Sequence, residues 1–170
     1  MYGTVNDGNT YFDSRLHGWD WKNASNADKT AALVEASELI DQFDYAEQKY
    51  TIVALGDKAD YTQAAWETAV QAANVSQPHE FPRGDVNTVP TDIEEATYLI
   101  ANALLSGRDP EQDLENQTLR TARMGQLSSA RDVAGNTNEH IAHLIPSVKA
   151  WHKIRPFLRR RDGFCYNRVR

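Results

Sequence analysis

The residues of this chain that could hold a metal ion are few and stand apart from one another. The segment His140-Ile-Ala-His143 follows Glu139 and places two imidazole side chains three residues apart. A zinc or transition-metal site needs three or four converging ligands with supporting partners, and no further His or Cys cluster lies nearby in the sequence. The pattern is more typical of a polar helix or turn surface, and we expect neither a bound metal nor a cofactor.

Residues suited to nucleophilic or acid–base catalysis are equally sparse. Cys165 is the single cysteine, and it lies in a terminal stretch that cannot hold a base at a fixed distance from it. The glycines are scattered singly, so neither a nucleophile elbow nor a phosphate-binding loop is present. Acid pairs such as Glu94–Glu95 are typical of solvated helix faces, whereas a catalytic carboxylate needs burial. The sequence predicts a protein that is not an enzyme.

The strongest chemical signal is a basic and aromatic stretch near the carboxyl end, around three consecutive arginines at 159–161. Guanidinium groups neutralise phosphates and aromatic rings stack on bases, so one interpretation is nucleic-acid binding. A second is a protein-docking arm, whose guanidiniums pair with carboxylates while its rings fill pockets of a partner. A third is a solvated basic end without a specific role. The candidate docking residues are Trp151, Arg155, Phe157, Leu158, Arg159, Arg160, Arg161, Phe164, Tyr166, Arg168 and Arg170.

Charge is segregated along the chain, and this helps to choose among the interpretations. Residues 1–119 hold 21 acidic and 7 basic side chains, whereas residues 120–170 hold 3 acidic and 11 basic ones. The front of the chain therefore carries a formal charge of −14 and the back carries +8. Because so acidic a body repels a DNA polymer, the pattern favours docking of the basic segment on an acidic protein partner, including a second copy.

Composition indicates the setting in which the chain folds. Its 170 residues are most simply one domain with an appendage, and 41% apolar residues allow a modest core. No apolar run is long enough to span a membrane, and the first residues do not have the pattern of a signal peptide. One cysteine cannot form an internal disulfide, which fits folding in a reducing cytoplasm. We expect no membrane partner.

Helices must position these side chains, and four are predicted for the acidic body. Three begin with a Ser or Thr cap three residues before an acid, at Thr4, Ser25 and Thr91, and apolar residues at helical spacing follow each cap. A fourth begins near Thr62 and places alanines along one side. We expect these helices to form a small bundle. The predicted helices span residues 4–16, 25–43, 62–73 and 91–105, and their bulky core residues are Trp19, Trp21 and Trp66.

The remaining segments are predicted to be less regular. Residues 51–55 form a short strand or a buried loop, and two prolines and a glycine make 78–84 an irregular loop. Two extended segments that meet at Gly125 predict a hairpin, with an irregular arm as the alternative. Pro146 can begin a last helix, and Pro156 can bend or end it. After that helix, residues 157–170 have no helical or strand period, and we expect a partner to order them.

Taken together, these elements predict a mainly α fold class. It consists of a small four-helix bundle with a β-hairpin or extended arm, followed by a C-terminal helix and an extended basic tail. The predicted parts are an acidic helical body at 1–117, the hairpin or extended arm at 118–145, and the C-terminal helix with its basic docking tail at 146–170.

Several short motifs follow one another in a distinctive order. They are Tyr2-Gly-Thr-Val-Asn-Asp-Gly-Asn-Thr-Tyr-Phe12, Trp19, Ala27-Asp-Lys-Thr-Ala-Ala-Leu-Val-Glu-Ala-Ser37, Phe81-Pro-Arg-Gly84, Val89-Pro-Thr-Asp-Ile-Glu-Glu-Ala96, Ile145-Pro-Ser-Val148 and Ile154-Arg-Pro-Phe-Leu158. Their order resembles the small head–tail connector, or adaptor, proteins of tailed bacteriophages. Some members of that group carry a "DnaT-like single-stranded-DNA-binding" label. Two departures are the stretch 51–74, which is longer than in the family, and the arginine-rich end past Leu158, which is additional.

The resemblance implies a structural virion protein that is made in the host bacterial cytoplasm and built into the neck of the particle. Such proteins form a homo-oligomeric ring, usually a dodecamer, beneath the portal protein. The ring extends the DNA channel, with genomic DNA as cargo, and receives tail nozzle, tail tube or fibre proteins. Under this resemblance we expect residues 157–170 to anchor each copy to the portal, and helices around 27–43 and 91–105 to form the ring wall.

A rival interpretation is a phage protein that binds single-stranded DNA through the same arginine-rich tail. Neutralisation of phosphates by several arginines predicts a steep loss of DNA affinity as salt rises. A ring component should instead show little affinity for free DNA and a strong tendency to assemble with its partner. A transcription or host-takeover accessory with a basic tail is a third option.

Overall fold

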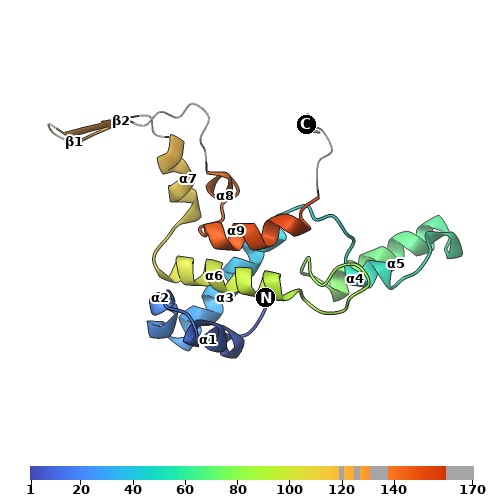
Figure 1. Cartoon of the computed structure of the whole chain (residues 1–170). Helices are drawn as coiled ribbons and strands as arrows, with labels where there is room; N and C mark the ends of the chain where they lie inside the picture. The colour runs from blue at the N-terminus through green and yellow to red at the C-terminus, as the bar shows by residue number, and fades with distance from the viewer. Residues whose placement is uncertain (119–120, 125–126, 131–137, 160–170) are drawn as a thin grey trace, which may run out of the picture. The chain divides into compact units, whose positions relative to one another are not determined.

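The computed structural model describes residues 1–118, 121–124, 127–130 and 138–159, and this part of the chain is mainly helical (Figure 1). Its packing divides the chain into two compact units. The first unit comprises Met1–Gln42 and Pro90–Ile154, and the second comprises Phe43–Val89 and the segment from Arg155 onward. The sequence-based division at residues 117 and 145 followed charge, whereas the compact units follow contacts between segments far apart in the chain.

The elements of the first unit are seven helices and two strands within the described residues. They are α1 (Val5–Asp13), α2 (Trp19–Asn23), α3 (Asn26–Asp41), α6 (Thr91–Leu105), α7 (Pro110–Thr118), β1 (Thr121–Met124), β2 (Leu127–Ala130), α8 (Glu139–Ala142) and α9 (Val148–Ile154).

Helix α6 is the centre of the first unit, since it packs against both α3 and α9 (Figure 1). Its apolar residues recur every three or four positions, so they share one broad face, and Ile93 and Ile100 are fully buried there. From α3, Leu33 and Ile40 are buried to the same degree, and Ile154 of α9 completes this layer. Burial of such side chains contributes about 1.5–3 kcal/mol each, so the packing of these three helices stabilises the unit substantially.

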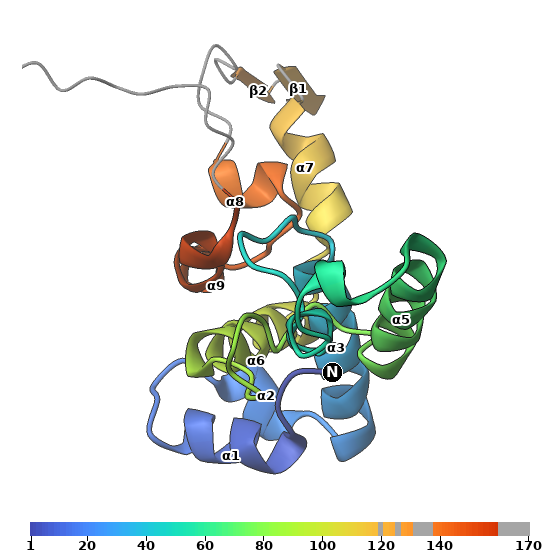
Figure 2. The ribbon, with the colours of Figure 1, turned by 90° about the vertical axis from the view of Figure 1, so that its right-hand side faces the viewer.

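Helices α1 and α2 lie beside α6 (Figure 2), and an aromatic cluster connects the three helices. The ring of Trp21 lies 5.4 Å from that of Phe12 and 6.4 Å from that of Tyr98, and all three side chains are buried. The indole nitrogen of Trp21 donates a 3.0 Å hydrogen bond to Asn9 Oδ1, and its amide donates to Asn102 Oδ1 at 3.1 Å. The aromatic packing buries the Trp21 ring, and these two hydrogen bonds fix its orientation.

Two of the three caps predicted from sequence are confirmed. Thr4 and Ser25 each accept a hydrogen bond from the backbone N–H three residues later, which satisfies one free donor of the first turn. Thr62, near which a fourth helix was predicted to begin, caps α5 in the same way. At the remaining helix the prediction was wrong by one residue: Pro90 occupies the cap position and Thr91 is already helical. At its other end Gly107 adopts a φ of +82° just beyond the helix, as a glycine stop signal requires.

Strands β1 and β2 pair in the antiparallel sense. Thr121 lies opposite Ala130, and Met124 lies opposite Leu127. Residues 125–126 between them lie outside the described residues, as do 131–137 after them.

The second unit contains α4 (Tyr50–Val53), the 3₁₀ turn η1 (Lys58–Asp60), α5 (Gln63–Ser76) and the 3₁₀ turn η2 (Arg155–Phe157). Its small core is formed by Tyr45 and Phe81, which are 1% and 3% exposed and whose rings meet edge to face at 4.7 Å. Helix α5 packs on α4, and only Ala73 of α5 is buried.

A buried amide, that of Gln77, holds the loop after α5. Its Nε2 donates to the carbonyl oxygens of Pro82 and His79 at 2.7 and 3.3 Å. Its Oε1 accepts from the amide and the hydroxyl of Thr51 at 3.2 and 3.1 Å. Because a buried amide group is costly to leave unpaired, these four bonds fix the loop predicted at 78–84 against the start of α4.

Several expectations are corrected by these observations. Helix α5 belongs to the second unit, so the helix predicted at 62–73 is not part of the packing of α3 and α6. Residues 51–55, predicted as a strand or a buried loop, lie largely within α4. Trp19 is 73% exposed and Leu16 is 96% exposed, so neither is a core residue, whereas Trp21 is buried as predicted. The last helix begins at Val148 and not at Pro146.

Candidate interaction surfaces

The beginning of the predicted docking tail is bound to its own chain. Within the second unit the amide of Ala46 donates to the carbonyl oxygen of Phe157 at 3.0 Å. The amide of Arg159 donates to the carbonyl oxygen of Asp44, also at 3.0 Å, and Leu158 pairs with Tyr45 in an isolated antiparallel bridge. We call this pairing of 44–46 with 157–159 the root of the tail. The start of the tail is therefore anchored on the second unit.

Side chains strengthen the root. The ring of Phe157 meets that of Phe81 edge to face at 5.6 Å, and Phe157 and Leu158 are both half-buried. The guanidinium of Arg159 lies 3.8 Å from the carboxylate of Asp44, and both groups are more than half exposed. Phe157 and Leu158, two of the predicted docking residues, thus pack in part on their own unit.

Trp151 is also removed from the set of residues that could dock. It is 3% exposed in the core of the first unit, where its ring stacks on that of His143 with centroids 4.7 Å apart. Arg155 is exposed. The other candidate residues lie outside the described residues: Arg160, Arg161, Phe164, Tyr166, Arg168 and Arg170.

Lys153, part of the basic stretch, is used inside the first unit. Its ammonium group lies 2.7 Å from Asp92 and 2.8 Å from Glu95, which connects α9 to α6. Partial burial opposes the charge on this lysine, but the hydrogen bonds to the two carboxylates outweigh that effect and raise the pKa of Lys153. The basic stretch before the root is thus partly neutralised within the molecule.

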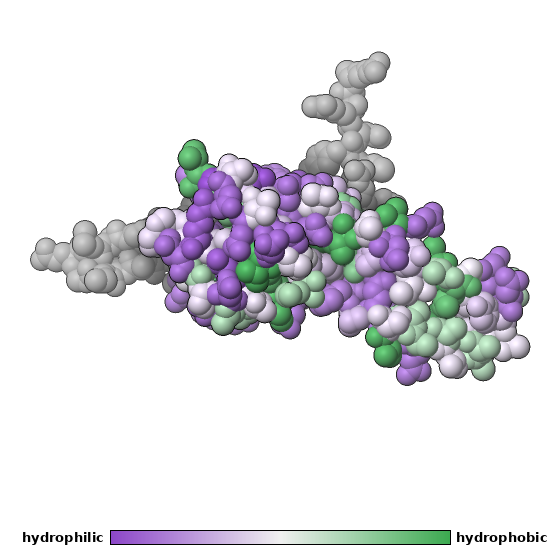
Figure 3. Space-filling model, turned by 90° about the horizontal axis from the view of Figure 1, so that it is seen from below, coloured by the Kyte–Doolittle hydropathy of each residue, from purple (hydrophilic) through white to green (hydrophobic). Residues whose placement is uncertain are grey.

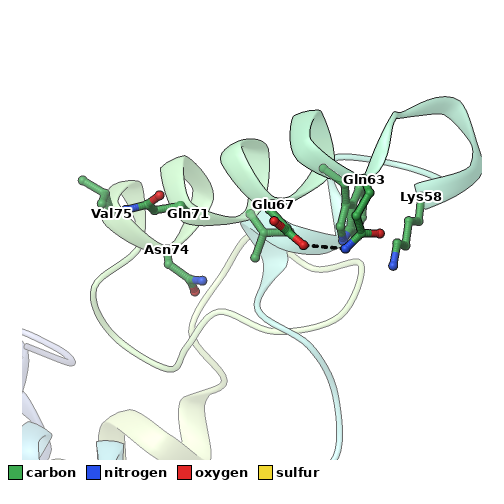
Figure 4. A pocket seen from close by; sticks show the side chains of 8 residues that line it. Lys58, Gln63, Glu67, Gln71, Asn74 and Val75 are labelled. Atoms are coloured by element: carbon green, nitrogen blue, oxygen red, sulfur yellow. Dashed lines mark hydrogen bonds between the residues drawn. The ribbon is translucent and has the colours of Figure 1, made fainter.

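A groove of about 590 Å³ runs along α5, and sequence reasoning did not predict it (Figure 4). One side chain of the η1 turn, Lys58, reaches toward it, and the helix supplies the rest of its lining. Gln63 and Glu67 are hydrogen-bonded to each other along the groove (Figure 4). The lining is mixed, with Trp66, Val70 and Val75 as its apolar part and Gln71 and Asn74 as further polar groups.

Helix α5 is unusual because so much of its apolar surface faces solvent. Glu67 is the one charged residue between Gln63 and Ser76, and Val75 is 78% exposed. Its exposed alanines give the pale green area at the right-hand end of Figure 3. A helix this poor in charge is unusual on a protein surface, where polar residues normally alternate with the buried stripe.

The two histidines that the sequence places three residues apart, His140 and His143, have different surroundings in the structure. The described residues contain no group of three or more His, Cys, Asp or Glu side chains placed to hold a metal ion. His140 lies at the start of α8, where burial, and secondarily the positive charge of Arg108, lowers its pKa. His143 is instead stacked on Trp151, so the two histidines do not form one site.

In comparisons with known proteins, no family model, curated protein or solved structure matches this chain. A search of the described helices for one both long and apolar enough to cross a membrane found none. The resemblance to phage connector proteins therefore remains a prediction that is based on the sequence motifs alone.

Proposed function

We propose that this chain is a head–tail adaptor of a tailed bacteriophage, a structural protein that assembles into a ring beneath the portal. In this role it has no catalytic task. Copies of the chain surround the DNA channel, the portal lies on one side of the ring, and tail nozzle, tube or fibre proteins bind on the other.

The observation that carries the proposal is the rooted basic tail on an acidic molecule. The backbone pairing of Asp44 and Ala46 with the segment 157–159 anchors the start of the tail on the second unit. Beyond the root the sequence continues with four more arginines and two aromatic residues. A segment of this kind, anchored at one end, is suited to bind an acidic neighbour in a repeating assembly.

The finer architecture belongs to the same proposal. The bundle-like packing of α3, α6 and α9 would form the ring wall, and the paired strands β1 and β2 would be an arm that reaches a neighbouring protein. Two-stranded ribbons are marginally stable alone and gain stability when another surface covers them. The basic tail would contact a neighbouring subunit of the neck, either the portal or the next copy.

Co-sedimentation with the portal protein of the same phage tests the proposal. The full chain is mixed with assembled portal rings at physiological salt, and the pelleted complexes are imaged by electron microscopy. We expect the chain to pellet with the portal and to add a ring of density on one of its faces. A chain that stays in the supernatant at all ratios would contradict the proposed function.

Binding of single-stranded DNA is the alternative, and the arginines of the tail are the observation that favours it. The acidic residues of the first 119 positions oppose it, because their field repels a nucleic acid. A fluorescent oligonucleotide titrated at two salt concentrations separates the two functions. Affinity that falls steeply between low and moderate salt, together with no portal binding, would replace the adaptor proposal with this one.

A further inference from the structure

A second groove lies within the first unit, where the ends of α3 and α6 meet the start of α7. Its volume is about 500 Å³. Leu39 of α3, Leu104 of α6 and Leu144 of the turn after α8 line it, and each of these leucines is half-buried. Three leucines that are neither fully covered nor fully exposed form an apolar floor open to solvent.

The walls of this groove are held in place by specific contacts. Arg108 Nη1 donates a 3.0 Å hydrogen bond to the carbonyl oxygen of Pro146, which connects the α6–α7 junction to the turn that carries Leu144. Leu144 has a φ of +57°, a left-handed conformation that costs a leucine about 1 kcal/mol. The turn is thus fixed despite this cost, and the floor of the groove is preformed.

Carboxylates surround the apolar floor. Glu35 of α3 and Glu111 of α7 are exposed at the rim. Asp109 also lines the groove and accepts hydrogen bonds from the amides of Glu111 and Gln112 at 2.9 and 3.4 Å. The one basic residue of the lining is Arg108, which is engaged with Pro146, so the rim is negative on balance.

We propose that this groove binds the C-terminal segment, residues 160–170, of a second copy of the chain. The inference rests on the proposed function, because it names the partner of the basic tail within the ring. Arg160, Arg161, Arg168 and Arg170 complement the carboxylate rim, and the rings of Phe164 and Tyr166 match the leucine floor.

Length and symmetry support this occupant. Eleven residues follow the root, and in extended form they reach about 35 Å, which is ample to enter a groove on an adjacent molecule. Each copy carries one basic tail and one leucine-floored groove of this kind, and the tail and the groove are different surfaces of the molecule. Such a head-to-tail contact repeats from copy to copy and closes into a ring when the rotation allows it.

Photo-crosslinking of the full chain tests the inference. Phe164 is replaced by a photoreactive benzoylphenylalanine, and this chain is mixed with an excess of ¹⁵N-labelled chain of normal sequence before irradiation. Mass spectrometry then identifies the crosslinked peptides and tells contacts between copies from contacts within one copy. We expect light-to-heavy crosslinks to the peptides that contain Leu104 and Leu144.

Charge reversal at the rim provides the matched control. Glu35→Lys with Glu111→Lys in the labelled chain should weaken light-to-heavy crosslinking about tenfold, because two attractive contacts become repulsive. Glu38→Lys makes the same change on α3, at an exposed position that does not line the groove, and should leave it unaltered. Circular dichroism confirms that each variant is folded.

The possible outcomes separate the inference from the proposed function. Crosslinks found only within one copy, or only outside the groove, would overturn the inference even if the chain still co-sediments with the portal. Crosslinks in the groove without any co-sedimentation would support the inference and overturn the adaptor function.

Discussion

The amide of Ala46 donates a 3.0 Å hydrogen bond to the carbonyl oxygen of Phe157, and this contact joins the loop after α3 to the end of the last helical segment. Through this contact and its neighbours, the first residues of the basic tail, 157–159, form part of the second unit. The arginines at 160 and 161 follow this pairing directly in the sequence.

The root is expected to depend on the aromatic contact that covers it. Phe157→Ala removes the edge-to-face contact with Phe81, and we expect a loss of about 2 kcal/mol in the free energy of unfolding, since the ring is half-buried. Hydrogen exchange at the Ala46 amide, measured by NMR, should accelerate in parallel. Val148→Ala, at a residue that is 48% exposed, is the control and should change neither quantity. Unaltered exchange in the Phe157 variant would show that the root does not rely on this ring.

Replacement of Gly8 by a larger residue is expected to destabilise the protein, although Gly8 lies inside helix α1. Alanine normally stabilises a helix by about 1 kcal/mol relative to glycine. Here, however, a Cβ at position 8 would lie 2.5 Å from Cζ2 of Trp21, whose ring is hydrogen-bonded to Asn9. We expect Gly8→Ala to lower the free energy of unfolding in urea by about 1–3 kcal/mol. Asn6→Ala, on the exposed side of the same helix, should not destabilise, and equal stability of the two variants would contradict this packing.

The contact between α9 and α6 through Lys153 should depend on pH and salt. Because the pKa of Lys153 is raised on folding, its contribution is fully present below the unfolded value near 10.5 and is lost as the pH rises through the folded value. Lys153→Met should therefore cost about 1 kcal/mol in the free energy of unfolding at pH 7 and low salt, and less in high salt. Urea titrations at pH 7 and above pH 10.5 measure this. A cost that stays the same at both pH values would mean that the lysine acts through its aliphatic stem alone.

Tyr98 should titrate apart from the exposed tyrosines. Burial of its hydroxyl, with smaller contributions from the Glu94 and Asp7 carboxylates, raises its pKa to about 12. Since the folded value exceeds the unfolded value of about 10, the neutral form stabilises the protein below pH 10 and this stabilisation is lost as the pH rises toward 12. In an absorbance titration at 295 nm, Tyr98→Phe should remove the step near pH 12. Loss of a step near pH 10 instead would contradict the burial of this hydroxyl.

Local chemistry explains which parts of the fold could be predicted from the sequence. Thr4 and Ser25 bond to backbone amides three residues away, so these caps could be predicted without any tertiary information. The glycine stop at Gly107 was readable for the same reason. By contrast, α7 carries almost no apolar residues, so the sequence has no apolar stripe at helical spacing from which to predict this helix.

Other features depend on contacts between distant segments and left no local signal. Trp19 and Trp21 lie on different sides of α2, and the sequence pattern alone could not tell which ring meets Phe12. The pairing of residues 44–46 with 157–159 joins segments that are far apart in the sequence. Residues 157–159 have no helical or strand period of their own, so the sequence alone does not predict this pairing. The leucine groove likewise combines α3, α6 and the turn at Leu144, which no single segment reveals.

Cryo-electron microscopy of the phage particles whose genome encodes this chain is the most direct measurement of the adaptor function. The account predicts a ring of helical density between portal and tail, into which the first unit fits as a rigid body with α6 between α3 and α9. Particles that contain no copy of the chain at the neck, while their portal and tail proteins are fully occupied, would contradict it.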